Sequence, residues 1–128
     1  MSRVRPPTQA ARAAYHRTHY AIGPVVLHIG RRPSDWPFDA RSLVLIGACN
    51  PSGQRLPDGV NIRLMRQLRA RLGRAPSWRG QGSWHAWSEP FFAVACPLPK
   101  ARVLARLFGQ NAVVLAQPHR RVRLVWLA

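Results

Sequence analysis

The chain has 128 residues, 47% of them hydrophobic, and this length suits one domain with its own core. Its longest apolar runs, SLVLIGAC and PFFAVACPL, fall well short of the roughly 20 residues that span a bilayer, which excludes a transmembrane helix. Twenty Lys and Arg residues face four acids, and the net charge of +16 attracts polyanions, either as a function or as a nonspecific property of a basic surface.

The compartment and the metal content follow from what the sequence lacks. The first twenty residues are basic but contain no continuous apolar segment, so we expect no secretory signal and a cytoplasmic location. Cys49 and Cys96 lie in apolar runs and are expected to be buried thiols. His16 and His19 share a helical face, but a zinc site needs further ligands that the sequence does not visibly supply. We therefore predict no metal and no cofactor.

The N-terminal third predicts a tail, a helix and a strand. Residues 1–7 are expected to be a flexible basic tail, followed by a single α+β domain over 8–128. Thr8 is a suitable N-cap for a helix over 9–20, which is rich in alanine and free of Gly and Pro. Residues 24–29 are rich in β-branched side chains and predict a strand.

The middle of the chain predicts a buried strand, a turn and a helix. Residues 31–41 form a loop interrupted by prolines. In residues 42–49 both the odd and the even positions are apolar, as in a strand that is covered on both faces. Asn50, Pro51 and Gly53 occupy positions that a type I turn favours. The helix over 60–73 has an apolar stripe, with arginines on much of its remaining surface.

The C-terminal part completes the predicted fold. Residues 90–97 indicate a short buried strand, 100–109 a second amphipathic helix, and 111–117 and 122–127 a terminal hairpin. Strands interspersed with helices predict an α+β two-layer sandwich, with a roughly five-stranded sheet and two to three helices.

Several short motifs occur in the order and spacing of a known family. AAYHRTHY lies near the start, GACNPSG ends a predicted strand, and GQG leads into WSEPFF before LFGQNAVV. Over residues 12–116 the chain thus resembles the bacterial family called domain of unknown function 3293. It departs from the family at the short loop 31–41, and at Gly47-Ala48-Cys49, where the family has Thr-Ala before Asn-Pro. The family name assigns no reaction, substrate or cofactor.

The resemblance implies a set of polar residues near strand ends and helix starts. Ends of this kind gather at one rim of an open sheet, which is where ligands tend to bind. The residues that match the polar part of the family pattern and form this candidate polar rim are Asn50, Asn61, Glu89, Gln110 and Asn111, with Pro51 beside them.

The sequence contains no strong pattern of catalytic residues. Paired-carboxylate chemistry needs two acids at one site, and Glu89 has no evident partner. Ser83 or Ser88 could combine with His85 and Glu89, but neighbouring residues of an extended segment point to opposite faces. Whether the protein is an enzyme stays open, leaning towards no.

Glu89 enters a strand that is apolar on both faces, where a buried charge must be paired or hydrogen-bonded. Because nineteen arginines are available, we expect an Arg–carboxylate fork that holds the aromatic segment to the sheet. The alternative is that Glu89 anchors a ligand or acts as a general base, with Gln110 and Asn111 as its polar neighbours.

Tryptophans and arginines interleave in the segment before Glu89, and such combinations stack single-stranded bases. The alternative is that these tryptophans fill the core. The candidate residues for binding an anion or a nucleic acid are Arg63, Arg66, Arg74, Arg79, Trp84 and Trp87, and Trp78 lies between them.

Three classes of function therefore stay open. The first is a basic module that binds anions or nucleic acid. The second is a small-molecule-binding protein or enzyme that uses the polar rim. The third is an adaptor that binds a protein partner through its arginine-rich helix faces and carries out no chemistry.

Overall fold

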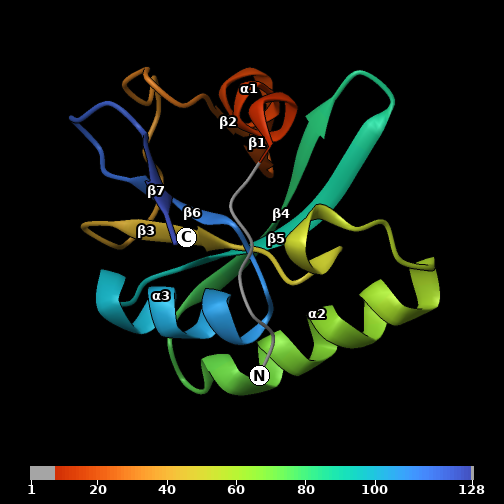
Figure 1. Cartoon of the computed structure of the whole chain (residues 1–128). Helices are drawn as coiled ribbons and strands as arrows, with labels where there is room; N and C mark the ends of the chain where they lie inside the picture. The colour runs from red at the N-terminus through yellow and green to blue at the C-terminus, as the bar shows by residue number, and fades with distance from the viewer. Residues whose placement is uncertain (1–7, 128) are drawn as a thin grey trace.

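A computed structural model describes residues 8–127 as three α-helices, one 3-10 turn and seven strands (Figure 1). The helices are α1 (Gln9–Arg17), α2 (Asp58–Leu72) and α3 (Leu98–Leu107), and the 3-10 turn η1 is Pro51–Gly53. The strands are β1 (His19–Ile22), β2 (Val25–Leu27), β3 (Leu43–Ile46), β4 (Ser77–Trp84), β5 (Trp87–Val94), β6 (Ala112–Ala116) and β7 (Arg123–Trp126). The predicted tail over residues 1–7 lies outside the described residues.

The strands form one antiparallel sheet in the order β2-β1-β4-β5-β3-β6-β7. The sheet curls so strongly that its two edges meet beyond β2, where Ile29 forms a parallel bridge with Val122. The Gly30 N–H donates to the Val122 carbonyl at 2.8 Å, and the Val122 N–H donates to the Arg31 carbonyl at 2.9 Å. These contacts cover backbone groups that an open edge would expose to other chains.

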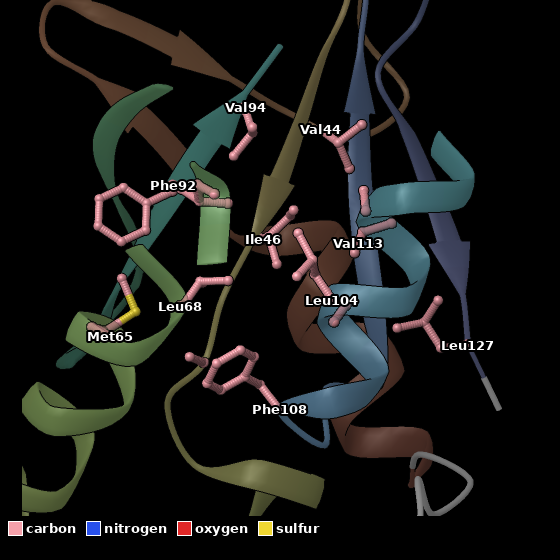
Figure 2. Packing of buried hydrophobic residues seen from close by; sticks show 14 of the residues in the cluster. Val44, Ile46, Met65, Leu68, Phe92, Val94, Leu104, Phe108, Val113 and Leu127 are labelled. Carbon is pink, nitrogen blue, oxygen red and sulfur yellow. The ribbon is translucent and has the colours of Figure 1, made fainter. Parts of the chain in front are cut away.

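Apolar side chains fill both sides of the curled sheet. On the convex side, α2 and α3 lie next to each other across the strands (Figure 1), where Met65 and Leu68 of α2, Leu104 of α3 and Ile46 belong to one buried cluster (Figure 2). The concave side holds a second cluster, which we call the concave core: Tyr20, Ile22, Val25, Leu27, Leu43, Leu45, Phe91, Ala93, Val114, Ala116 and Val122. Because the two sides are both covered, the central strand β3 is buried at every position.

The predicted α+β class with two to three helices is confirmed, but the sheet differs from the prediction. It has seven strands rather than roughly five, and it curls instead of forming a flat layer in a sandwich. One missed strand is β1: the helix predicted over 9–20 ends at Arg17, where the Thr18 hydroxyl donates to the Ala14 carbonyl at 2.6 Å and strand pairing begins.

The second missed strand is β4, which the glycines and tryptophans of its sequence presented as a loop. Its glycines are required by close packing: a Cβ on Gly80 would collide with the Phe91 ring and would come within 2.6 Å of the Ala21 carbonyl oxygen. Glycine in a strand commonly marks such a close approach. β4 therefore pairs with β5 over its whole length, and the two form a long hairpin that extends beyond the rest of the sheet (Figure 1).

Candidate functional site

The chain leaves β3 through a tight turn at Asn50, whose φ of 48° lies in the left-handed region that asparagine tolerates. The Asn50 Oδ1 accepts hydrogen bonds from the Leu56 N–H and from Asn61 Nδ2, both at 2.8 Å. In return, Asn61 Oδ1 accepts from the Asn50 N–H at 3.0 Å. The two predicted asparagines therefore bind each other and attach the turn to the first part of α2.

Gln110 and Asn111 reach the same turn from the start of β6. Gln110 Nε2 donates to the carbonyls of Cys49 at 3.0 Å and Phe108 at 3.1 Å. Asn111 is buried, and a Cβ on Gly53 would lie 4.0 Å from its Nδ2 atom. Its Oδ1 has no hydrogen-bond partner within residues 8–127. These two residues thus lie beside the Asn50 turn, with Asn111 on the convex side, where its strand neighbour Val113 packs against the helices.

Glu89 lies on the concave face, in a row of residues that crosses three strands. It is paired with Gly82 of β4, which is paired in turn with Tyr20 of β1. Gly82 has no side chain, so its neighbours approach it closely: a Cβ at this position would lie 3.6 Å from the Tyr20 ring and 3.4 Å from the Thr18 methyl group. The Glu89 carboxylate accepts hydrogen bonds from the side chains of Asn50 and Trp87. Asn50 therefore joins the turn to Glu89.

The electrostatics of this cluster follow from burial. Desolvation raises the pKa of Glu89 above its ordinary value, and its two hydrogen bonds offset the rise in part. Burial, followed by the Glu89 charge, raises the pKa of the Cys49 thiol and of the Tyr15 phenol, to about 11 and about 12 respectively. Burial also raises the pKa of Tyr20. At neutral pH the thiol and phenols are therefore protonated, and Cys49 is a poor nucleophile.

Within residues 8–127, the arginine fork that the sequence predicted for Glu89 is not formed, because the carboxylate is held there by Asn50 and Trp87. The reason lies in the alternation of strand residues. Trp78 packs against the concave core, so the next residue, Arg79, projects from the opposite face and is exposed. Among residues 8–127, two neutral side chains rather than a guanidinium donate hydrogen bonds to the Glu89 carboxylate.

The possible Ser-His-acid arrangement is not assembled. Ser83 and Ser88 face each other across the hairpin, and the Ser88 hydroxyl accepts a hydrogen bond from Gln81. Ser88 and Glu89 are consecutive in a strand and point to opposite faces. His85 lies in the hairpin turn with φ of 55°, against the Trp84 ring.

An aromatic cluster occupies the tip of the hairpin, which we define as residues 84–87. Trp84 and Trp87 are paired across the two strands, and Trp87 is 42% exposed. The His85 ring lies 4.7 Å from that of Trp84, and the guanidinium of Arg17, the last residue of α1, lies 5.8 Å from the Trp84 ring. Trp78, in contrast, contacts Phe38 and belongs with the concave core, so only part of the aromatic segment is exposed.

The predicted anion-binding arginines are all exposed. Arg63 and Arg66 lie on the solvent side of α2, whose buried residues are Met65, Leu68 and Leu72. Arg74 follows the end of α2, and Arg79 lies on β4. The structure thus separates two groups of predicted residues: arginines on the convex side, and the hairpin tip with Glu89 on the concave face.

Sequence reasoning missed the contributions of Tyr15, Tyr20 and Arg17. All three lie where a single helix over 9–20 was predicted. The two-residue spacing of Tyr20 and Ile22, which are both buried in β1, is the sequence pattern that could have identified this strand. Within the described chain, three or more His, Cys, Asp or Glu side chains do not come together as a metal site, and His19 contacts His28. None of the described helices is long and apolar enough to cross a membrane.

Comparison with known proteins identifies one family. The family model described as "Protein of unknown function (DUF3293)" matches residues 46–113, more than half of the chain. This match covers the Asn50 turn, α2, the hairpin and the start of β6. Neither the curated proteins nor the solved structures contain a significant match.

Proposed function

Since this chain belongs to the DUF3293 family, whose description assigns no activity, we propose a function from its geometry: it binds polyanions, and nucleic acid in particular, through its arginine surface. The observation that supports this proposal most directly is the exposure of the cations. Every arginine within residues 8–127 except Arg102 is exposed, while one of the four acids, Glu89, is withdrawn from the surface. The positive charge is therefore available to a ligand.

The solvent side of α2 is the proposed phosphate-contacting surface. Arg63 and Arg66 project from it, and Arg69 and Arg71 continue the exposed positive charge towards its C-terminal end. A guanidinium binds phosphate oxygens with two parallel N–H donors. Each neutralised phosphate releases condensed counterions, which gives binding a steep dependence on salt.

The test is the salt dependence of nucleic-acid affinity, measured by fluorescence anisotropy. Wild-type protein is compared with the double variant Arg63→Gln/Arg66→Gln and with the control Arg31→Gln/Arg32→Gln, which loses the same charge from a distant exposed loop. We expect the first variant to reduce the log–log salt slope by about 1.5, since each lost phosphate contact removes about 0.7–0.9. We expect a smaller change from the control pair.

Two outcomes would contradict the proposal. Equal slope changes in both double variants would mean that α2 is not the contact surface. Equal, weak binding of DNA, RNA and heparin at ~150 mM salt would reduce the interaction to nonspecific attraction of a basic protein.

A further inference from the structure

We propose that the concave face of the β4–β5 hairpin tip recognises a guanine base in single-stranded nucleic acid, with Trp87 as the stacking surface and Glu89 as the acceptor for the guanine edge. This inference rests on the proposed function, because the arginine surface provides the affinity for the phosphate backbone. It adds a base-specific site at the opposite side of the sheet.

The hairpin tip has an exposed aromatic surface that the core does not use. Trp87 is 42% exposed, and it pairs across the hairpin with Trp84. The Arg17 guanidinium lies 5.8 Å from the Trp84 ring, so a cation accompanies the aromatic pair. Exposed aromatic rings beside arginine are the groups on which proteins stack unpaired bases.

Glu89 is on the same face as these rings. The register pairs Trp84 with Trp87 and Gly82 with Glu89, and residues two apart on a strand point to the same side. Trp87 and Glu89 are therefore separated by about 7 Å along β5, and the Trp87 side chain donates a hydrogen bond to the carboxylate. A base that stacks on Trp87 can therefore bring one edge within reach of Glu89.

The chemistry of a carboxylate selects the base. An ionised carboxylate only accepts hydrogen bonds, and its two oxygens suit two adjacent donors. On the Watson–Crick edge, guanine presents such a pair, N1–H and N2–H. Adenine, cytosine and uracil or thymine each lack two adjacent donors on that edge. In a duplex this edge is occupied by pairing, so recognition requires a single strand.

Neutral side chains of the described residues hold the Glu89 carboxylate in place. Asn50 donates from the turn, and Asn61 and the Leu56 N–H fix Asn50 through its Oδ1 atom. A partly desolvated acceptor with fixed orientation strengthens a hydrogen bond to a ligand. This arrangement explains why the one acid withdrawn from the surface is held by neutral donors among residues 8–127, although this part of the chain is rich in arginine.

The test measures binding of short single strands that differ at one central base: guanine, inosine or adenine, in an otherwise uracil sequence, at ~150 mM salt. We expect wild-type protein to bind the guanine strand roughly fivefold or more tighter than the adenine strand, with inosine between them because it lacks the N2 amine. Glu89→Gln should abolish this preference and leave the salt slope unchanged. The control Asp39→Asn removes an exposed acid from a distant loop and should retain the preference.

The wild-type comparison needs no variant, so it stands even if Glu89→Gln fails to fold. Salt-dependent binding without a preference for guanine would overturn this inference and leave the proposed function intact. Failure to bind any nucleic acid would overturn both. Competition by GMP at the same concentration as the guanine strand would overturn the assignment to single strands, because a free nucleotide would then suffice.

Discussion

At the scale of single residues, Glu89 contributes to the dependence of stability on pH. Burial raises its pKa in the folded protein above the value of 4.5 for a free side chain, so the folded state binds the proton more tightly than the unfolded state. Stability from this group is therefore greatest at low pH and decreases as pH rises through the unfolded and then the folded pKa. Ionisation of this buried carboxyl group therefore costs stability.

We predict that Glu89→Gln keeps or raises the melting temperature at pH 7, because the amide avoids the cost of burying a charge. The gain over wild type should shrink as pH falls to 4, where the wild-type carboxyl group becomes protonated. Thermal denaturation over this pH range measures the difference, with Asp39→Asn as an exposed control. A large loss of stability at pH 7 would show instead that the ionised carboxylate supports the fold.

The sequence predicted some of the residues around Glu89 but not the contacts between them. It identified Glu89, Asn50 and Asn61, whose residue types stand out in apolar or turn segments. It did not identify the partners of Glu89, because these depend on which residues the strand register places on one face. The expected arginine fork failed for that reason: Arg79 is close in sequence to the aromatic segment but projects from the other face.

At the scale of elements, the Asn50 turn attaches β3 to α2. Asn50 contributes two things, a tolerance of left-handed backbone and a side-chain oxygen that accepts two hydrogen bonds. Two substitutions separate them. Asn50→Gly keeps the backbone conformation accessible but loses the side chain, whereas Asn50→Ala loses both.

We predict that both variants lower the free energy of unfolding, by about 1–3 kcal/mol for the unsatisfied partners, and that Asn50→Ala is the less stable of the two. Chemical denaturation measures both values. Unchanged stability in both variants would contradict the role of Asn50 in attaching the turn to α2. It would favour an asparagine that faces a ligand.

Elements with regular hydrophobic patterns were predictable and short or glycine-rich strands were not. α2 and α3 follow from their apolar stripes, and β3 from its continuous apolar run. β4 contains glycines that weaken any local strand preference, and its extended form is imposed by pairing with β5 and β1. Tertiary pairing of this kind overrides local propensity and is not encoded within a short window.

At the scale of the whole molecule, the α+β class was predictable from the alternation of elements, whereas the curl of the sheet was not. The contact between Ile29 and Val122 joins segments far apart in the sequence, and it depends on the twist accumulated over seven strands. The placement of Trp87 and Glu89 on the concave face follows from the strand register and the curl together, so their relation required the structure.

The net charge of +16 leads to a prediction about the molecule as a whole. Like charges on a compact surface repel each other, and salt reduces this repulsion as the Debye length falls from about 30 Å at 0.01 M to about 8 Å at 0.15 M. We therefore expect the melting temperature to rise over this range of sodium chloride. Sodium sulfate at equal ionic strength should raise it further, because sulfate strengthens apolar burial by exclusion from the protein surface and because a ligand of the folded state adds stability beyond screening.

The comparison of the two salts tests whether charge screening alone accounts for the rise in melting temperature. Equal effects of chloride and sulfate would mean that the arginines act only through their summed charge. A melting temperature that falls with added salt would show that attraction between the few acids and nearby arginines outweighs repulsion. That result would contradict the arrangement of exposed cations on which the proposed polyanion binding depends, because those cations would then already be engaged within the folded protein.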